Sequence, residues 1–240
     1  MSNVVGKVFL LGSLLILVGA FQATGYEAAS VADGGSIVGQ VTFSGTPPAP
    51  EKLPVTKDPE VCGKEKISEK LIVSPDNKGI QNVAVTITDI KKGKKLEVAK
   101  VEFDQKECQF RPHVLVVPAS ATVDIKNSDA TLHNIHTFST ANPPINKAQP
   151  KVKKVMSEKF EKPEMIKVQC DAHAWMSGWF VVTDHPYVAL TDAKGAFKIA
   201  DVPPGTYTVE FWHETLGKQT QKVEVKPKAE TSVTLEMSQK

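Results

Sequence analysis

The sequence has little arginine and no long helical pattern, and each scarcity narrows the possible classes of protein. Among its 29 Lys and Arg residues only Arg111 is an arginine, and 27 acidic residues leave a formal net charge of +2. So balanced a charge argues against nucleic acid as a partner. Short alternating apolar runs, separated by Gly, Pro, Asn and Asp, take the place of amphipathic helices. This pattern predicts an all-β protein built from sandwiches.

A hydrophobic run long enough for an ordinary membrane span is also missing. Residues 8–21 are largely apolar, but a span needs about 20 such residues. Lys7 precedes this run and Ala23, Thr24 and Gly25 follow it as small residues. We therefore predict that residues 1–25 are an export signal, so that the mature protein is periplasmic or secreted. We expect no stable membrane span after signal removal; an uncleaved anchor is the alternative. No cysteine lies near the cleavage site, which argues against a lipid anchor.

No hydrolytic triad is evident. The side chains best suited to bind a metal lie instead in residues 167–183, KVQCDAHAWMSGWFVVT. Ile166, Val168 and Cys170 alternate with polar residues, which predicts a strand with the Cys170 sulfur facing a core. His173 and Met176 follow at Cys-x2-His-x2-Met spacing. A thiolate, an imidazole and a thioether suit a trigonal copper site, which has two imidazoles, one thiolate and a weak axial Met.

The second imidazole is expected in residues 131–137, TLHNIHT. Val123 and Ile125 alternate with polar residues, so a strand runs into the turn-forming sequence NSD at 127–129. His133 follows shortly after this turn, with Asn134 behind it. His136 is either a surface histidine or a substitute ligand.

Together, the His133-Asn134 and Cys170-His173-Met176 segments resemble the cupredoxin family, and most closely its short-loop, amicyanin-like members. The resemblance covers roughly residues 100–184 and implies a Greek-key β-sandwich that binds one copper per chain. It implies that the ligands are His133, His173, the Cys170 thiolate and, as a long axial ligand, Met176. It further implies that Asn134 ties the two ligand segments together near the sulfur, with His136 and Trp175 close to the site. Asp171 and Ala172 replace a proline common in that family, and the acid could lower the reduction potential or change the geometry.

The same resemblance implies that His173 lies on an exposed loop and that its edge is the electron port. Trp175 and Trp179 are expected to flank it, either as an apolar docking patch or as a shield against water. We expect His113 to hydrogen-bond within its own strand, and residues 142–154 to form a polar loop. Docking of an acidic partner by the lysines of that loop is an alternative.

Three cysteines in an exported chain leave one unpaired. With Cys170 assigned to copper by the resemblance, we hypothesise a Cys62–Cys108 disulfide. This bond would staple the N-terminal segment to the copper-binding part of the chain.

Beyond the copper motif, residues 191–212, TDAKGAFKIADVPPGTYTVEFW, resemble the carboxypeptidase regulatory-like (transthyretin-like) β-sandwich family. The opening strands of that family resemble SIVGQVTF and NVAVTI, which here precede the copper motif. We therefore predict a second, smaller, discontinuous sandwich of residues 34–90 and 186–240, with a cupredoxin domain at 100–184 inserted. The alternative is three successive units. For His213 and Glu214 we expect a structural or interface role.

These patterns predict an exported type 1 copper protein that transfers single electrons to or from an unknown redox partner protein. We expect no enzyme, because four protein ligands leave no open metal position for a substrate. One alternative is a periplasmic copper carrier or delivery protein. The other is a cell-envelope binding module in which the Cys170 cluster has no redox role.

Overall fold

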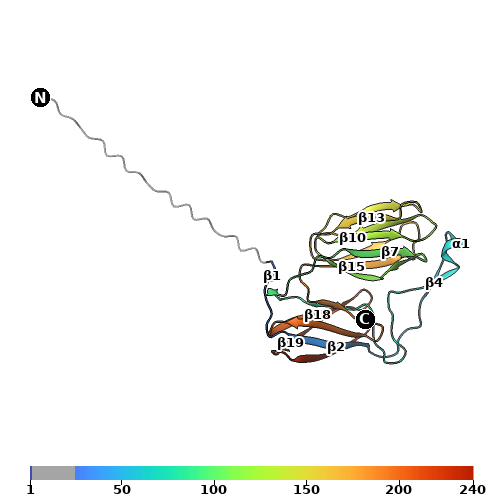
Figure 1. The fold of residues 1–240 in the computed structure, drawn as a ribbon. Coiled ribbons are helices and arrows are strands. Elements are labelled where there is room, and N and C mark those ends of the chain that lie inside the picture. Colours follow the sequence, from blue (N-terminus) through green and yellow to red (C-terminus); the bar gives the residue numbers. More distant parts are fainter. Residues whose placement is uncertain (2–24, 240) are drawn as a thin grey trace.

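The computed structural model describes Met1 and residues 25–239, so the predicted export signal at 1–25 lies almost entirely outside the described residues. Within the described residues the chain is all-β, as predicted, with one short helix, α1 (Pro59–Cys62). The strands form two stacked sandwiches (Figure 1). Nowhere in this described part is a helix long and apolar enough to cross a membrane.

The first sandwich, at the top of Figure 1, consists of nine strands in two sheets. Its four-stranded sheet has the order β13 (Val155–Lys159), β10 (Thr122–Asn127), β7 (Val101–Lys106) and β8 (Gln109–Arg111). Its five-stranded sheet has the order β12 (Asn146–Gln149), β11 (His133–Phe138), β14 (Glu164–Gln169), β15 (Ser177–Thr183) and β9 (Val114–Pro118). The β7–β10 and β9–β15 pairs are parallel, and the others are antiparallel.

The core of the first sandwich follows from the alternation of apolar residues. Ile166 and Val168 of β14 are fully buried and Cys170 is 2% exposed, so the predicted inward face is confirmed. Opposite them, the Phe103 ring of the other sheet meets the Phe180 ring of β15 edge-on at 4.7 Å between centroids. This packing gives β14, which precedes Cys170, a rigid support.

The second sandwich joins strands from both ends of the chain. One sheet has the order β16 (Val188–Leu190), β5 (Ala84–Ile87), β18 (Gly205–His213) and β19 (Gly217–Val225). The other has the order β17 (Ala196–Val202), β2 (Gly35–Phe43) and β20 (Glu230–Met237). In the sequence, β2 and β5 precede the first sandwich, whereas the remaining strands follow it. Close pairing of β2 with β20 requires Gly39, because a Cβ there would lie 1.9 Å from the Val233 carbonyl oxygen.

Between β2 and β5 the chain leaves the second sandwich, reaches the end of the first and returns (Figure 1). We call residues 52–67 the cap; they comprise β3 (Lys52–Pro54), α1 and β4 (Glu65–Ile67), with β3 and β4 paired antiparallel. The predicted disulfide between Cys62 and Cys108 is present and ties the cap to the first sandwich. Separately, β1 (Glu27–Ala28) pairs with β6 (Lys92–Gly93).

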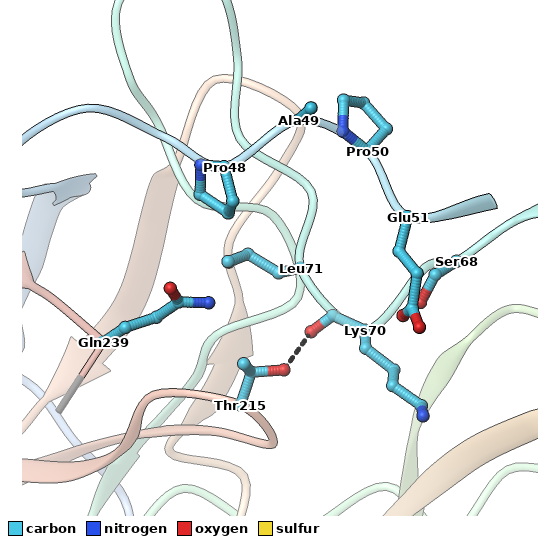
Figure 2. A pocket seen from close by; sticks show the side chains of 9 residues that line it. All are labelled: Pro48, Ala49, Pro50, Glu51, Ser68, Lys70, Leu71, Thr215 and Gln239. Carbon is cyan, nitrogen blue, oxygen red and sulfur yellow. Dashed lines mark hydrogen bonds between the residues drawn. The ribbon is translucent and has the colours of Figure 1, made fainter.

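The two arms that lead to and from the cap meet over the second sandwich. Figure 2 shows Pro48 of the outgoing arm facing Leu71 of the returning arm at a small pocket that Pro50 also lines. The Thr215 hydroxyl of the second sandwich donates to the Lys70 carbonyl oxygen at 2.6 Å. The base of the cap is thereby fixed to the second sandwich.

Residues 142–154 differ from the predicted polar loop, because residues 146–149 form β12. Their backbone pairs with β11, from His133 opposite Gln149 to His136 opposite Asn146. Three of the four residues of β12 are exposed. An edge strand with such a polar sequence lacks the apolar alternation from which strands are predicted.

Candidate metal centre

Two paired strands and the loop after one of them bring the predicted ligands together. His133 begins β11, and Cys170 directly follows β14, which pairs with β11 through His136 opposite Gln169. The loop from Cys170 to Met176 is closed by hydrogen bonds between its ends. The Met176 amide donates to the His173 carbonyl oxygen at 2.9 Å, and the Cys170 amide donates to the Met176 carbonyl oxygen at 3.3 Å.

His133, Cys170 and His173 form a compact triangle of donor atoms. The two Nδ1 atoms lie 3.0 Å apart, and the Cys170 Sγ lies 3.9 Å from that of His133 and 3.8 Å from that of His173. A point in their plane is about 2 Å from each atom, close to ordinary metal–nitrogen and metal–sulfur bond lengths of about 2.0 and 2.3 Å. All three residues are buried. The arrangement fits one metal ion in a trigonal site of two imidazoles and one sulfur.

The two imidazoles differ in protonation. Burial disfavours the charged form of His133, but the hydrogen bond to Asp129 and the nearby Cys170 sulfur raise its pKa to about 9. Burial lowers the pKa of His173, and the opposing hydrogen bond to Asp58 does not compensate fully. Two Nδ1 atoms at 3.0 Å hydrogen-bond only when one of them carries a proton. A cation bound between them would replace this proton.

A carboxylate accepts a hydrogen bond from the far nitrogen of each imidazole. The His133 Nε2 lies 2.9 Å from Asp129 Oδ2, and the His173 Nε2 lies 2.9 Å from Asp58 Oδ2. Burial opposes ionisation of Asp129, but its hydrogen bonds with His133 and with the amides of Cys108 and Glu107 lower its pKa overall. A carboxylate behind an imidazole fixes the ring orientation and turns the other nitrogen towards a metal.

Asn134 connects the two ligand segments. Its backbone amide donates to the Cys170 Sγ at 3.4 Å, and its side-chain oxygen accepts the Asp171 amide proton. The Asp171 carboxylate accepts hydrogen bonds from Asn146 at 2.9 Å and from His136 at 3.0 Å. These bonds turn the acid beside the sulfur towards β11 and β12. The hydrogen bond from His136 is the largest cause of the lowered pKa of Asp171.

The structure places the remaining predicted residues as follows. Met176 is 1% exposed and belongs to the core that contains Cys170. Trp175 lies against His173, with 5.0 Å between ring centroids, and donates to the Cys108 carbonyl oxygen at 3.0 Å. These contacts favour a shielding role for Trp175. His136 lies outside the triangle, with its ring stacked on Phe138 at 4.3 Å.

Three sequence-based expectations are wrong. His173 is fully buried, because the cap brings Asp58 against its outer edge, so it forms no exposed electron port. Trp179 packs against Trp212 of the second sandwich, with 4.7 Å between centroids, and does not flank His173. His113 hydrogen-bonds Glu214 of the second sandwich rather than its own strand, which gives Glu214 the expected interface role.

The sequence analysis missed the carboxylates Asp58 and Asp129. Asp129 could have been found from its place in the turn, four residues before His133. Asp58 lies 115 residues from His173, and its only signal is the hypothesised disulfide, because Cys62 is four residues further along the chain.

Known proteins resemble both parts of this chain. The family model of the carboxypeptidase regulatory-like domain matches residues 180–238, which include β16 to β20. No curated protein matches the chain. The predicted resemblance to this family is confirmed for residues 180–238. Among solved structures, cupredoxins are similar to part of the chain.

A copper-containing nitrite reductase from Thermus scotoductus SA-01 has 22% identity and a TM-score of 0.34, over 41% of this chain and 25% of the reductase. This chain thus spans a quarter of the reductase. A purple cupredoxin from Nitrosopumilus maritimus has 21% identity and a TM-score of 0.30, over 35% of this chain and 100% of the cupredoxin. A reduced amicyanin variant has 23% identity and a TM-score of 0.32, over 37% of this chain and 85% of amicyanin.

Proposed function

We propose that this protein is an exported type 1 copper protein that transfers single electrons. The observation that supports this proposal is the buried triangle of two imidazole Nδ1 atoms and the Cys170 sulfur. Two histidines and one thiolate with a weak axial Met are typical of blue-copper sites. Bound copper would supply a one-electron couple between its two oxidation states.

In this proposal His133, His173, Cys170 and Met176 would hold one copper ion per chain. The chain's own contribution is to hold the ligands in one arrangement for both oxidation states. The Asn134 amide supports this role, because its hydrogen bond fixes the Cys170 sulfur. The packed sandwich behind β14 resists movement of the ligands.

Electron transfer accounts for the buried site better than delivery of copper does. Delivery requires a partner's ligands to reach the ion, whereas the three ligand residues are 0–2% exposed. An electron, in contrast, can cross a layer of packed side chains to a redox partner protein. Since Asp58 covers His173 and His133 is also fully buried, neither imidazole offers an exposed edge to a partner.

The same enclosure supports a role without substrate turnover. The cavity that reaches Trp175 and Met176 has a volume of only about 10 Å³, roughly the space of one water molecule. A substrate would have to displace the cap or a ligand to meet the metal. We therefore propose a carrier of electrons rather than an enzyme.

We also propose the domain division and the location of the protein. Pairing of β2 and β5 with β20 and β18 supports a discontinuous domain of residues 34–90 and 186–240 around a copper-binding domain of residues 100–184. The Cys62–Cys108 disulfide supports an oxidising compartment, the periplasm or the exterior. The second sandwich would serve as a docking or structural module.

Absorption and electron-paramagnetic-resonance spectra of the Cu(II)-loaded protein test this function. We expect an intense visible sulfur-to-copper band and narrow parallel hyperfine splitting, both lost in Cys170→Ser. Reversible one-electron reduction would then support electron transfer. Weak colour with wide splitting that is unchanged in Cys170→Ser would reject the proposal.

A further inference from the structure

The cap contributes a polar contact to the metal centre from outside the sandwich that carries the ligands. Asp58 belongs to the segment between β2 and β5, whereas His133, Cys170 and His173 belong to the first sandwich. Its Oδ2 accepts hydrogen bonds from the His173 Nε2 at 2.9 Å and from the Thr131 hydroxyl at 2.7 Å. The Asp58 side chain is 27% exposed, while that of His173 is fully buried. Asp58 therefore separates the edge of His173 from solvent.

Both the backbone and the side chain of Asp58 are fixed. The residue adopts a left-handed conformation with φ 49°, which aspartate tolerates better than most residues do. Its carbonyl oxygen accepts the amide protons of Val61 at 3.0 Å and Cys62 at 2.9 Å. Such a backbone persists where the surroundings hold it in place, as these bonds do.

The disulfide links the two carboxylates behind the imidazoles. On one side, the Cys62 amide donates to the Asp58 carbonyl oxygen. On the other, the Cys108 amide donates to Asp129 Oδ2 at 2.8 Å, and the same oxygen bonds the His133 Nε2. The Cys62–Cys108 bond thus joins the acid behind His173 to the acid behind His133.

This arrangement has two consequences for the ligands. A carboxylate that accepts the Nε2 proton keeps the Nδ1 lone pair of His173 free for a metal and makes the ring a stronger donor. Its negative charge also favours the more highly charged oxidation state of a bound metal. Displacing the ring from the metal would require the hydrogen bond to Asp58 to break.

We propose that Asp58 is a positioning residue that holds His173 on the metal. The cap is then part of the metal centre and slows release of copper. This inference rests on the proposed function. Asp58 does not contact the metal; it acts through His173. The cap serves to retain copper, which the ligand set alone would release faster.

The test compares Asp58→Ala and Asp58→Asn with Glu60→Gln in the full chain. Glu60 is an exposed acid of the cap, two residues after Asp58, with no hydrogen bond to a ligand. We expect Asp58→Ala to increase the rate of copper loss to a chelator about 10–100-fold and to alter the paramagnetic spectrum. Asp58→Asn keeps an acceptor without the charge, so it should restore the spectrum but raise the reduction potential. Glu60→Gln should match the wild type.

Equal rates and potentials for Asp58→Ala and Glu60→Gln would overturn the inference, provided that the wild type shows the sulfur-to-copper band. Absence of that band in the wild type would instead reject the proposed function. Thr131→Val keeps the Asp58 charge but removes the bond that orients it, and should give an intermediate rate of copper loss. Thermal unfolding of each apo variant shows whether the fold is retained. A faster loss explained fully by a lower melting temperature would also overturn the inference.

Discussion

At the scale of single residues, the environments of His133 and His136 decide which imidazole can bind a metal. His133 is fully buried, with Nδ1 facing Cys170 and Nε2 on Asp129. The side chain of His136 is 30% exposed, and its Nδ1 bonds Asp171. Two residues of the same type in one strand thus offer different chemistry, because the Nδ1 of His133 faces the Cys170 sulfur and that of His136 faces a carboxylate.

We predict that His133→Ala abolishes the intense sulfur-to-copper band and that His136→Ala leaves it in place. Removal of His133 leaves two of the three atoms of the triangle, whereas removal of His136 takes one hydrogen bond from Asp171 and leaves the triangle intact. Absorption and paramagnetic-resonance spectra of both Cu(II)-loaded variants provide the comparison. The reverse result, with the band lost only in His136→Ala, would make His136 the ligand.

A second histidine outside the centre makes stability depend on pH. Burial lowers the pKa of His213 to about 4, and its Nδ1 accepts the Thr215 amide proton at 3.2 Å, as a neutral imidazole does. An unfolded histidine has a pKa of about 6.5. Between these two values the unfolded chain binds a proton that the folded chain does not. Acidification through this range therefore lowers the free energy of unfolding.

We predict that protonation of His213 in the unfolded chain lowers the free energy of unfolding by about 2 kcal/mol when the pH falls from 7.5 to 5. His213→Gln keeps a polar side chain but lacks the titration. Urea unfolding gives the free energy of unfolding of both proteins at both pH values. The contribution of His213 is the fall in this free energy in the wild type minus the fall in His213→Gln. Equal losses in wild type and variant would show that His213 is not held neutral.

At the scale of elements, the cap determines how the centre meets solvent. The disulfide joins residues that are 46 positions apart in the sequence. It lowers the conformational entropy of the unfolded chain and so stabilises the folded state by about 4 kcal/mol. The cap contributes few residues to the core, among them Cys62 and the partly buried Val55 and Val61. An element with so few buried apolar contacts opens locally at a low cost in free energy once the disulfide is removed.

We predict that combining Cys62→Ser with Cys108→Ser exposes Cys170 in the apo protein. The rate of its modification by a thiol reagent under native conditions should rise, because the cap opens more often. Cys170 is the only free thiol in both proteins, so the readout is unambiguous. A stability loss without faster modification would mean that Asp58 and Thr131 hold the cap closed without the disulfide.

The elements also show what the sequence could and could not predict. The alternation around Ile166 and Val168 predicted β14 and the inward direction of Cys170, because side chains on a strand alternate between its faces. The edge strand β12 was missed because its sequence is polar. The burial of His173 was missed because Asp58 approaches from 115 residues away, a contact that local patterns do not encode. The sequence predicted that His133, Cys170 and His173 lie together, but not which residues pack behind them.

At the scale of the whole molecule, the two sandwiches are joined by a small buried interface. Ala84 of the second sandwich packs with Val114 and Val181 of the first, and Trp212 meets Trp179 nearby. The Glu214 carboxylate bonds the His113 Nε2, and both side chains are buried, 10% and 4% exposed. Apolar packing and a buried pair should make the two sandwiches unfold together.

We predict that Trp212→Ala separates the unfolding of the two sandwiches. The substitution removes a partly buried ring, at a cost of up to about 3 kcal/mol, and the loss falls on the interface rather than on either core. Calorimetry of the apo protein should show one transition in the wild type and two in the variant. Val155→Ala, which shortens a 46% exposed side chain on β13 in the other sheet of the first sandwich, should retain one transition. The copper spectrum should be unchanged in Trp212→Ala, because the first sandwich and the cap carry every residue of the centre. A single transition in that variant would mean that the arms of the cap, fixed to the second sandwich at Thr215, couple the two sandwiches without the interface.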